Sequence, residues 1–136
     1  MISSGPMEDR LAIRELVESY NDAVMRFDAD AWQSNWAEDA SWTLPGAGAI
    51  KSRAAIVGVW KQAMSAFEFV GFFASAGPII VDGSTASGTW YQQEFLHQKD
   101  GVKRRITGRY DDTYVKAGGR WYFASRVYNV LNAAEG

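Results

Sequence analysis

The sequence predicts an α+β fold in which three helices precede a strongly curved, mainly antiparallel sheet. Before about Ala66, apolar residues recur at helical spacing, whereas later aromatic-rich stretches alternate as strands do. Glycine-containing turns separate those later stretches, and Lys99-Asp100-Gly101 and Ala117-Gly118-Gly119 have the chemistry of hairpin turns. Helices followed by hairpin-linked strands are typical of an α+β domain.

Three helices are expected in the first half of the chain. The first covers residues 7–27, where an apolar residue recurs every three or four positions. Asp28 is placed to cap a second, short helix in which Trp32 and Trp36 lie one turn apart. Ser52 is placed to cap a third helix with an apolar buried face.

The expected strands are short at first and long towards the C-terminus. Glycines inside the long strands, Gly88 and Gly108, allow the sheet to bend into a half-open cone. The strands are predicted at residues 41–44, 67–73, 78–81, 85–97, 102–116 and 120–131.

Composition narrows the class of protein. The chain of 136 residues suits one domain, residues 1–136, and its 47% hydrophobic content supports a sizeable core. The chain has a net charge of −2, so it does not have the excess of basic residues that nucleic-acid binding requires. With no cysteine, the chain can form neither disulfides nor thiolate metal sites.

No membrane segment and no metal site are expected. Apolar runs such as residues 69–74 are far shorter than the roughly 20 residues that span a bilayer. Residues 1–7 lack the basic start and apolar centre of an export signal, so we expect a cytoplasmic protein. A single histidine, His97, argues against a histidine-rich metal site.

Three stretches carry a resemblance to a known family: residues 20–40 (YNDAVMRFDADAWQSNWAEDA), residues 79–86 (IIVDGSTA), and residues 108–112 (GRYDD) with Gly119-Arg120-Trp121 after them. They resemble the nuclear-transport-factor-2-like superfamily, within its SnoaL-like branch of small dehydratases, cyclases and isomerases. The resemblance implies a cystatin-like α+β cone, with an apolar interior closed by helices. It also implies cofactor-free proton-transfer chemistry and a homodimer formed through the sheet.

The chain departs from that family at its usual polar positions. Related dehydratases and dehydrochlorinases use an Asp–His pair, which falls here on Met25 and Phe72. The base of the ketosteroid-isomerase-like relatives falls on Leu44. Neither familiar catalytic arrangement is therefore present in its usual form.

Three residues remain as candidates for catalysis. Tyr20 matches the first-helix tyrosine that donates to an oxyanion in the steroid isomerases. His97 falls within a residue of a second catalytic histidine in scytalone-dehydratase-like relatives, and Tyr110 matches a strand position that lines the pocket. The resemblance predicts that Tyr20, His97 and Tyr110 polarise a carbonyl or phenol and move one proton.

The alternation of the predicted strand leaves the direction of His97 open. His97 shares its side with Tyr91 and Gln93. If His97 faces outwards, Gln92 and Glu94 become the inward polar pair.

A second set of residues is predicted to shape an apolar pocket for a flat aromatic or polycyclic molecule, with core packing as the alternative for the tryptophans. Arg109 and Arg126 could each bind an acidic ligand, although surface ion pairing is the expected role, with Asp111 and Asp112 as neighbours. The predicted substrate-binding residues are Met25, Trp42, Leu44, Trp60, Phe72 and Tyr91.

Two hypotheses of function follow. In the first, the protein is a cofactor-independent lyase or isomerase of dehydratase type, acting on a small aromatic or polycyclic substrate. In the second, it is a non-catalytic ligand-binding or dimerisation module with the same cone. Pocket polarity decides between them, because function resides in the site rather than in the fold.

Overall fold

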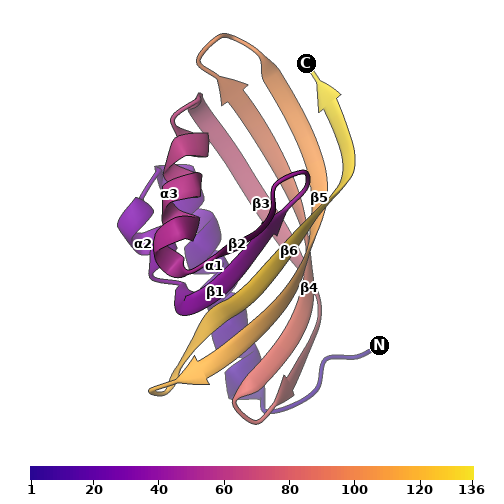
Figure 1. Ribbon diagram of the computed structural model, residues 1–136. Helices are drawn as coiled ribbons and strands as arrows, with labels where there is room; N and C mark the ends of the chain where they lie inside the picture. The colour runs from indigo at the N-terminus through magenta and orange to yellow at the C-terminus, as the bar shows by residue number, and fades with distance from the viewer.

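The computed structural model describes all 136 residues and places a layer of helices against one face of a single curved sheet (Figure 1). The sheet has six strands in the order β2-β1-β6-β5-β4-β3. The elements in chain order are α1 (Met7–Arg26), α2 (Ala29–Gln33), β1 (Trp36–Leu44), β2 (Gly48–Lys51), α3 (Arg53–Met64), β3 (Phe67–Asp82), β4 (Thr85–Gln98), β5 (Lys103–Ala117) and β6 (Arg120–Glu135).

The sheet is mainly antiparallel, as predicted. Among the named strands, only β1 and β6 pair in parallel, which places the first and last strands side by side, second and third from the β2 edge of the sheet. The long strands β3 to β6 form a meander that bends around the helices, and the predicted α+β cone is confirmed (Figure 1).

Two helix caps form as the sequence predicts. The Asp28 side chain accepts a hydrogen bond from the backbone N–H of Ala31 at 3.0 Å, and that of Ser52 accepts from Ala55 at 3.2 Å. These caps satisfy backbone donors that have no partner inside the helix.

Several predicted boundaries are wrong, and the short strand β2 was not predicted. Trp36 is not in the second helix, because that helix ends at Gln33 and Trp36 begins β1. The stretches 67–73 and 78–81 are one strand, β3, interrupted by a register shift between Ala76 and Ile79. The last strand continues to Glu135.

The core fills the space between the helices and the concave face of the sheet. It is dominated by large aromatic side chains, since six tryptophans and three tyrosines are buried in it. No helix is long and apolar enough to cross a membrane.

Candidate functional site

Four tryptophans from α2, β1 and α3 pack together at the helical end of the cone; we call them the tryptophan cluster (Trp32, Trp36, Trp42 and Trp60). Trp32 lies at their centre and stacks on Trp60, with ring centroids 4.6 Å apart. Its centroid lies 5.4 Å from that of Trp42 and 5.6 Å from that of Trp36. All four are almost completely covered, so they fill the interior.

Tyr20 and Tyr110, the two predicted catalytic tyrosines, are brought together inside the cone. Both are buried, and the guanidinium of Arg126 lies over both rings, 4.6 Å from the centroid of Tyr20 and 3.8 Å from that of Tyr110. Burial raises the pKa of both hydroxyls, so they stay neutral and able to donate hydrogen bonds.

A buried ion pair holds Arg126 in place. Its Nε donates to Asp112 Oδ1 at 2.8 Å, while the Tyr114 hydroxyl donates to Asp112 Oδ2 at 2.7 Å. The indole N–H of Trp90 donates in turn to the Tyr114 hydroxyl at 2.9 Å. Asp112 and Arg126 do pair as charged neighbours, but in the core rather than at the surface; Arg109 and Asp111 form the expected surface pair.

Beside Tyr110 lies a group of three polar side chains, Gln92, Glu94 and Tyr128, which we call the polar strip. Gln92 Nε2 donates to Glu94 Oε1 at 2.7 Å and also to the Tyr128 hydroxyl. The Tyr128 hydroxyl lies 3.3 Å from Glu94 Oε1, and the rings of Tyr110 and Tyr128 are 4.8 Å apart. The polar strip therefore surrounds one carboxyl with two donors.

Within the polar strip, Glu94 is the side chain that could act as a general acid or base. Burial raises the pKa of its carboxyl to about 7, against hydrogen bonds from Tyr128 and Gln92 that lower it. A carboxyl that is half ionised near neutral pH can both accept and return a proton. Such perturbed groups are concentrated at functional sites.

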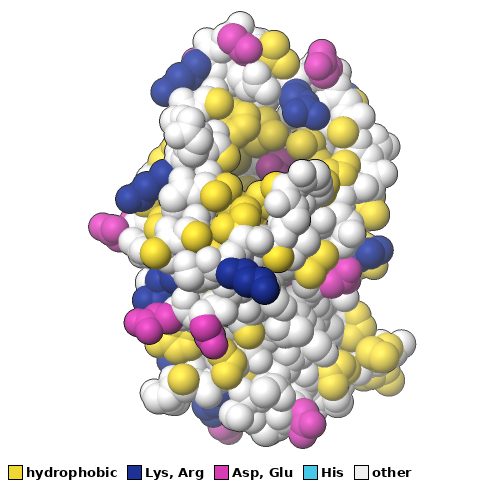
Figure 2. All heavy atoms as spheres, in the orientation of Figure 1, with side chains coloured by type: hydrophobic (Ala, Val, Ile, Leu, Met, Phe, Trp, Pro, Cys, Tyr) yellow, Lys and Arg dark blue, Asp and Glu magenta, His cyan; other side chains and the backbone are white.

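The concave side remains accessible next to these residues. A hollow of about 400 Å³ lies where the end of β1 separates from β6, with Leu44 and Tyr128 in its lining. Figure 2 shows the molecule recessed above the β1–β2 hairpin, with hydrophobic side chains gathered around an acidic one. Of the acidic side chains at inward positions of β4 and β5, Asp112 is fully covered and Glu94 is only partly buried.

His97 is not part of this site, which corrects its predicted role as a catalytic base. It pairs across the sheet with Phe69, and the two rings are 5.0 Å apart. Phe69 is 44% exposed, and Tyr91, on the same side of β4, is 48% exposed. Alternation therefore puts His97 and Tyr91 on the outer face, because Trp90, Gln92 and Leu96 occupy the buried positions of the strand.

The other predicted pocket residues divide into covered and exposed positions. Trp42, Trp60 and Phe72 face the interior and are buried, and Leu44 is partly buried against the core. Met25 is 38% exposed on α1, so, like Tyr91, it does not line the buried interior.

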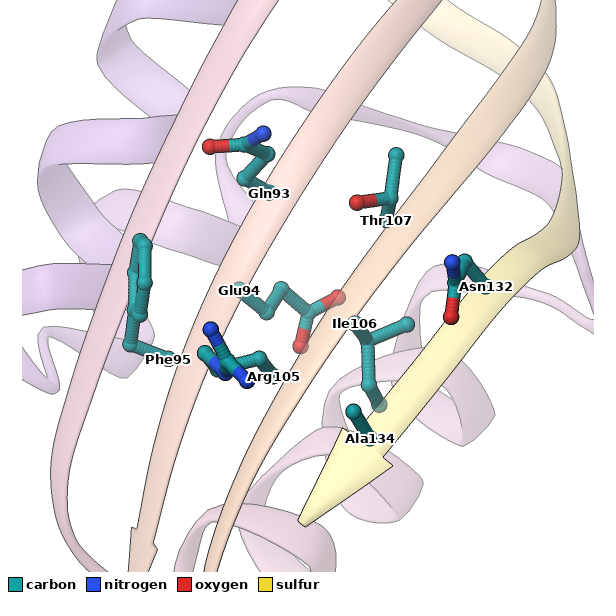
Figure 3. Close-up of a pocket in the computed structure, with 8 residues that line it drawn as sticks. All are labelled: Gln93, Glu94, Phe95, Arg105, Ile106, Thr107, Asn132 and Ala134. Atoms are coloured by element: carbon teal, nitrogen blue, oxygen red, sulfur yellow. The ribbon is translucent and has the colours of Figure 1, made fainter. Parts of the chain in front are cut away.

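The outer face has a basin of its own, of about 280 Å³ (Figure 3). Two cross-strand rows from β4, β5 and β6 form it: Gln93, Thr107 and Asn132, then Phe95, Arg105 and Ala134. Glu94 and Ile106 also border the basin, but their positions alternate to the interior. No three His, Asp or Glu side chains in the structure cluster as metal ligands would.

Comparison with known proteins supports the sequence resemblance. Residues 6–127 match the SnoaL-like domain. The chain belongs to this family. A search of curated protein sequences finds no significant match.

Solved structures share the fold of this SnoaL-like protein over nearly its whole length. One from Novosphingobium aromaticivorans, provisionally described as an aromatic ring hydroxylase, is 25% identical with a TM-score of 0.90, covering 98% of this chain and 96% of its own. Another from the same species, provisionally described as a scytalone dehydratase, is 17% identical with a TM-score of 0.88 over 96% and 89%. A type 2 hexachlorocyclohexane dehydrochlorinase (LinA) is 16% identical with a TM-score of 0.88 over 96% and 90%.

Tyr128 and the buried role of Arg126 are the features that the sequence reasoning missed. Glu94 and Gln92 entered only as the pair that faces inwards if His97 faces outwards. The available signal was the alternation of β5 and β6, since Asp112 stands between Tyr110 and Tyr114 on one side of its strand.

Proposed function

We propose that the protein is a cofactor-free lyase or isomerase that moves a proton on a small aromatic or polycyclic substrate, with Glu94 as the proton-carrying group. The observation that supports this most directly is the partly buried Glu94 carboxyl, held by Tyr128 and Gln92 on the inner face of a cone whose core is mainly aromatic. Apolar walls with a few polar groups are typical of small-molecule sites.

The proposed step begins with ionised Glu94. Its carboxylate takes a proton from a carbon next to a carbonyl, the C–H bond breaks, and the electron pair moves to the carbonyl oxygen. Once Glu94 has taken the proton, it no longer needs the Tyr128 hydroxyl as a donor, and that hydroxyl turns to donate to the substrate oxygen. The neutral hydroxyls of Tyr110 and Tyr20 are further donors in the same part of the cone. Expulsion of a leaving group from the next carbon completes a lyase reaction, and return of the proton to another carbon completes an isomerisation.

The substrate class follows from the lining. Leu44, Pro45 and Val130 border the hollow beside Tyr128, and Trp42, Trp60 and Phe72 are buried in the core of the same cone. These side chains offer area to a flat apolar molecule and no charge to an ionic one.

The test needs a ligand first and a proton-transfer readout second. A thermal-shift screen of phenols, quinones, steroids and small polyketides would find binders, since a ligand near 100 times its Kd adds about 2.7 kcal/mol to stability. Each binder is then incubated with protein in D₂O, and loss of its acidic C–H signal is followed by proton NMR. We expect exchange that Glu94→Gln slows by about 100-fold or more.

The matched control is Glu68→Gln, the same chemical change at an exposed position of β3. It should leave the exchange rate unchanged. A ligand that binds without any exchange would instead support the non-catalytic binding module.

We also propose that the protein forms a homodimer through the outer face of the sheet. Phe69, Phe73 and Tyr91 are large exposed side chains on that face. Large apolar side chains left exposed on one face are typical of interaction surfaces. Light scattering after gel filtration should give twice the chain mass, and Phe73→Glu should restore the monomer.

A further inference from the structure

Gly108 on β5 lies in contact with the ring of Tyr128. A Cβ built at this position would come within 2.5 Å of Tyr128 Cε1 and 2.7 Å of its hydroxyl oxygen. Gly108 is not among the glycines with positive φ, so its backbone conformation does not itself demand glycine. Glycine is required at position 108 because the Tyr128 ring leaves no room for a side chain there.

Tyr128 takes an oblique path across the sheet. Its neighbour in register on β5 is Tyr110, whereas Gly108 lies opposite Val130 and Gln92. The Tyr128 hydroxyl nevertheless reaches Gln92 and Glu94 on β4, one strand further on. The ring can cross β5 in this direction only because Gly108 leaves the space above the strand free.

From this geometry we infer that Gly108 is a positioning residue: it admits the Tyr128 ring over β5 and so sets the hydrogen bonding of the Glu94 carboxyl. The inference rests on the role proposed for Glu94, but it concerns how that carboxyl is held and can be tested without a substrate. Alanine at position 108 would displace the end of a side chain that is itself only partly buried. We therefore expect a folded protein in which Tyr128 has moved away from Glu94.

The titration of Glu94 reports that displacement. The hydrogen bonds from Tyr128 and Gln92 lower the pKa of Glu94, against burial, which raises it. The titratable groups that act on Glu94 are Tyr128 on β6, Tyr110 on β5 and Tyr20 on α1, and burial raises the pKa of all three. They stay neutral while Glu94 titrates, so loss of the Tyr128 hydroxyl leaves the carboxylate with one donor fewer.

The experiment is a pH titration of the full chain labelled with ¹³C at the glutamate carboxyls, with Glu94→Gln used to assign the signal. In Gly108→Ala we expect the midpoint of Glu94 to rise by about one pH unit, since a hydrogen bond to a charged group is worth that order. Gly58→Ala is the control, because a Cβ there meets nothing within 4 Å. It should leave the midpoint unchanged.

Testing Gly108→Ala in a second protein, the Tyr128→Leu variant, separates an effect on the position of Tyr128 from a general disturbance of the sheet. Tyr128→Leu removes both the ring and the hydroxyl, so it should raise the midpoint by itself. Adding Gly108→Ala to Tyr128→Leu should then change nothing further. An unchanged midpoint in Gly108→Ala, or an equal rise in both backgrounds, would overturn the inference.

The same pair of variants decides the matter if Gly108→Ala does not fold. With the ring gone, the double variant must fold like Tyr128→Leu, and a double variant that stays unfolded contradicts the inference. Proton exchange that survives in Glu94→Gln, together with a shifted midpoint in Gly108→Ala, would refute the proposed function and leave the role of Gly108 intact.

Discussion

The tryptophan cluster and the polar strip line the same cone, but they are held together in different ways. Trp32, Trp36 and Trp42 pack ring against ring, and their indole N–H groups have no hydrogen-bond partner. In the polar strip, Glu94 accepts from both Gln92 and Tyr128. The cluster thus supplies area and rigidity, while the strip supplies a proton acceptor.

Because of this difference, we expect substitutions in the tryptophan cluster to change mainly the stability of the fold and substitutions in the polar strip to change mainly proton transfer. Burial of large aromatic rings dominates the free energy of unfolding at the helical end. A carboxyl whose pKa burial raises to about 7 instead costs stability when it is charged. A site that weakens the fold in this way is expected where function, rather than packing, selects the residue.

Replacing the centre of the cluster should have the largest effect. Trp32→Ala removes the ring that contacts Trp36, Trp42 and Trp60, and we expect a loss of about 3–5 kcal/mol in the free energy of unfolding. Urea denaturation followed by far-UV circular dichroism measures it. Met25→Ala is the control on the exposed side of α1 and should change stability by less than about 1 kcal/mol. Equal losses would show that the cluster is not the main support of this end.

Glu94→Gln should sharpen the comparison through its pH dependence. The folded pKa of Glu94, about 7, lies above its ordinary value of 4.5. The folded state therefore binds more protons than the unfolded state between these values, and wild-type stability falls as pH rises through them. The variant lacks this penalty. Relative to wild type it should gain about 3 kcal/mol between pH 4.5 and pH 8.

Denaturation curves of both proteins at pH 4.5 and pH 8 give this difference directly. The exposed change Glu68→Gln should show no such trend. If Glu94→Gln differs from wild type in stability by the same amount at pH 4.5 and at pH 8, the Glu94 carboxyl is solvated in the folded state. The polar strip would then not weaken the fold, and this difference from the tryptophan cluster would not exist.

Most of the fold was predictable because it depends on local sequence patterns that agree with one another. The caps at Asp28 and Ser52, the hairpin turns and the change from helical spacing to alternation all point to one architecture. Trp36 was misassigned because its spacing from Trp32 suits a helix, whereas pairing with Phe123 of β6 draws it into a strand. That pairing joins residues far apart in the sequence, which local patterns do not reveal.

The site was less predictable, because alternation defines two faces without saying which one is buried. On β4 the choice lies between Gln92 with Glu94 and Gln93 with His97, and each set holds one titratable group. The contacts of Tyr128 decide it, since its hydroxyl needs the inward pair. Tyr128 reaches them only across Gly108, a relation between three strands that no single-strand pattern encodes.

The smallest expected effect belongs to His97, one of the three residues that the family resemblance predicts to be catalytic. His97→Gln keeps a polar side chain on the outer face, beside Phe69 and away from Glu94. We expect proton-exchange rates within about twofold of wild type, since a group that transfers the proton would cost about 100-fold or more when removed. The measurement uses the ligand and D₂O assay that tests Glu94→Gln. If His97→Gln instead loses most of the proton exchange while Glu94→Gln keeps the wild-type rate, the chemistry takes place on the outer face of β4 and not on the inner face.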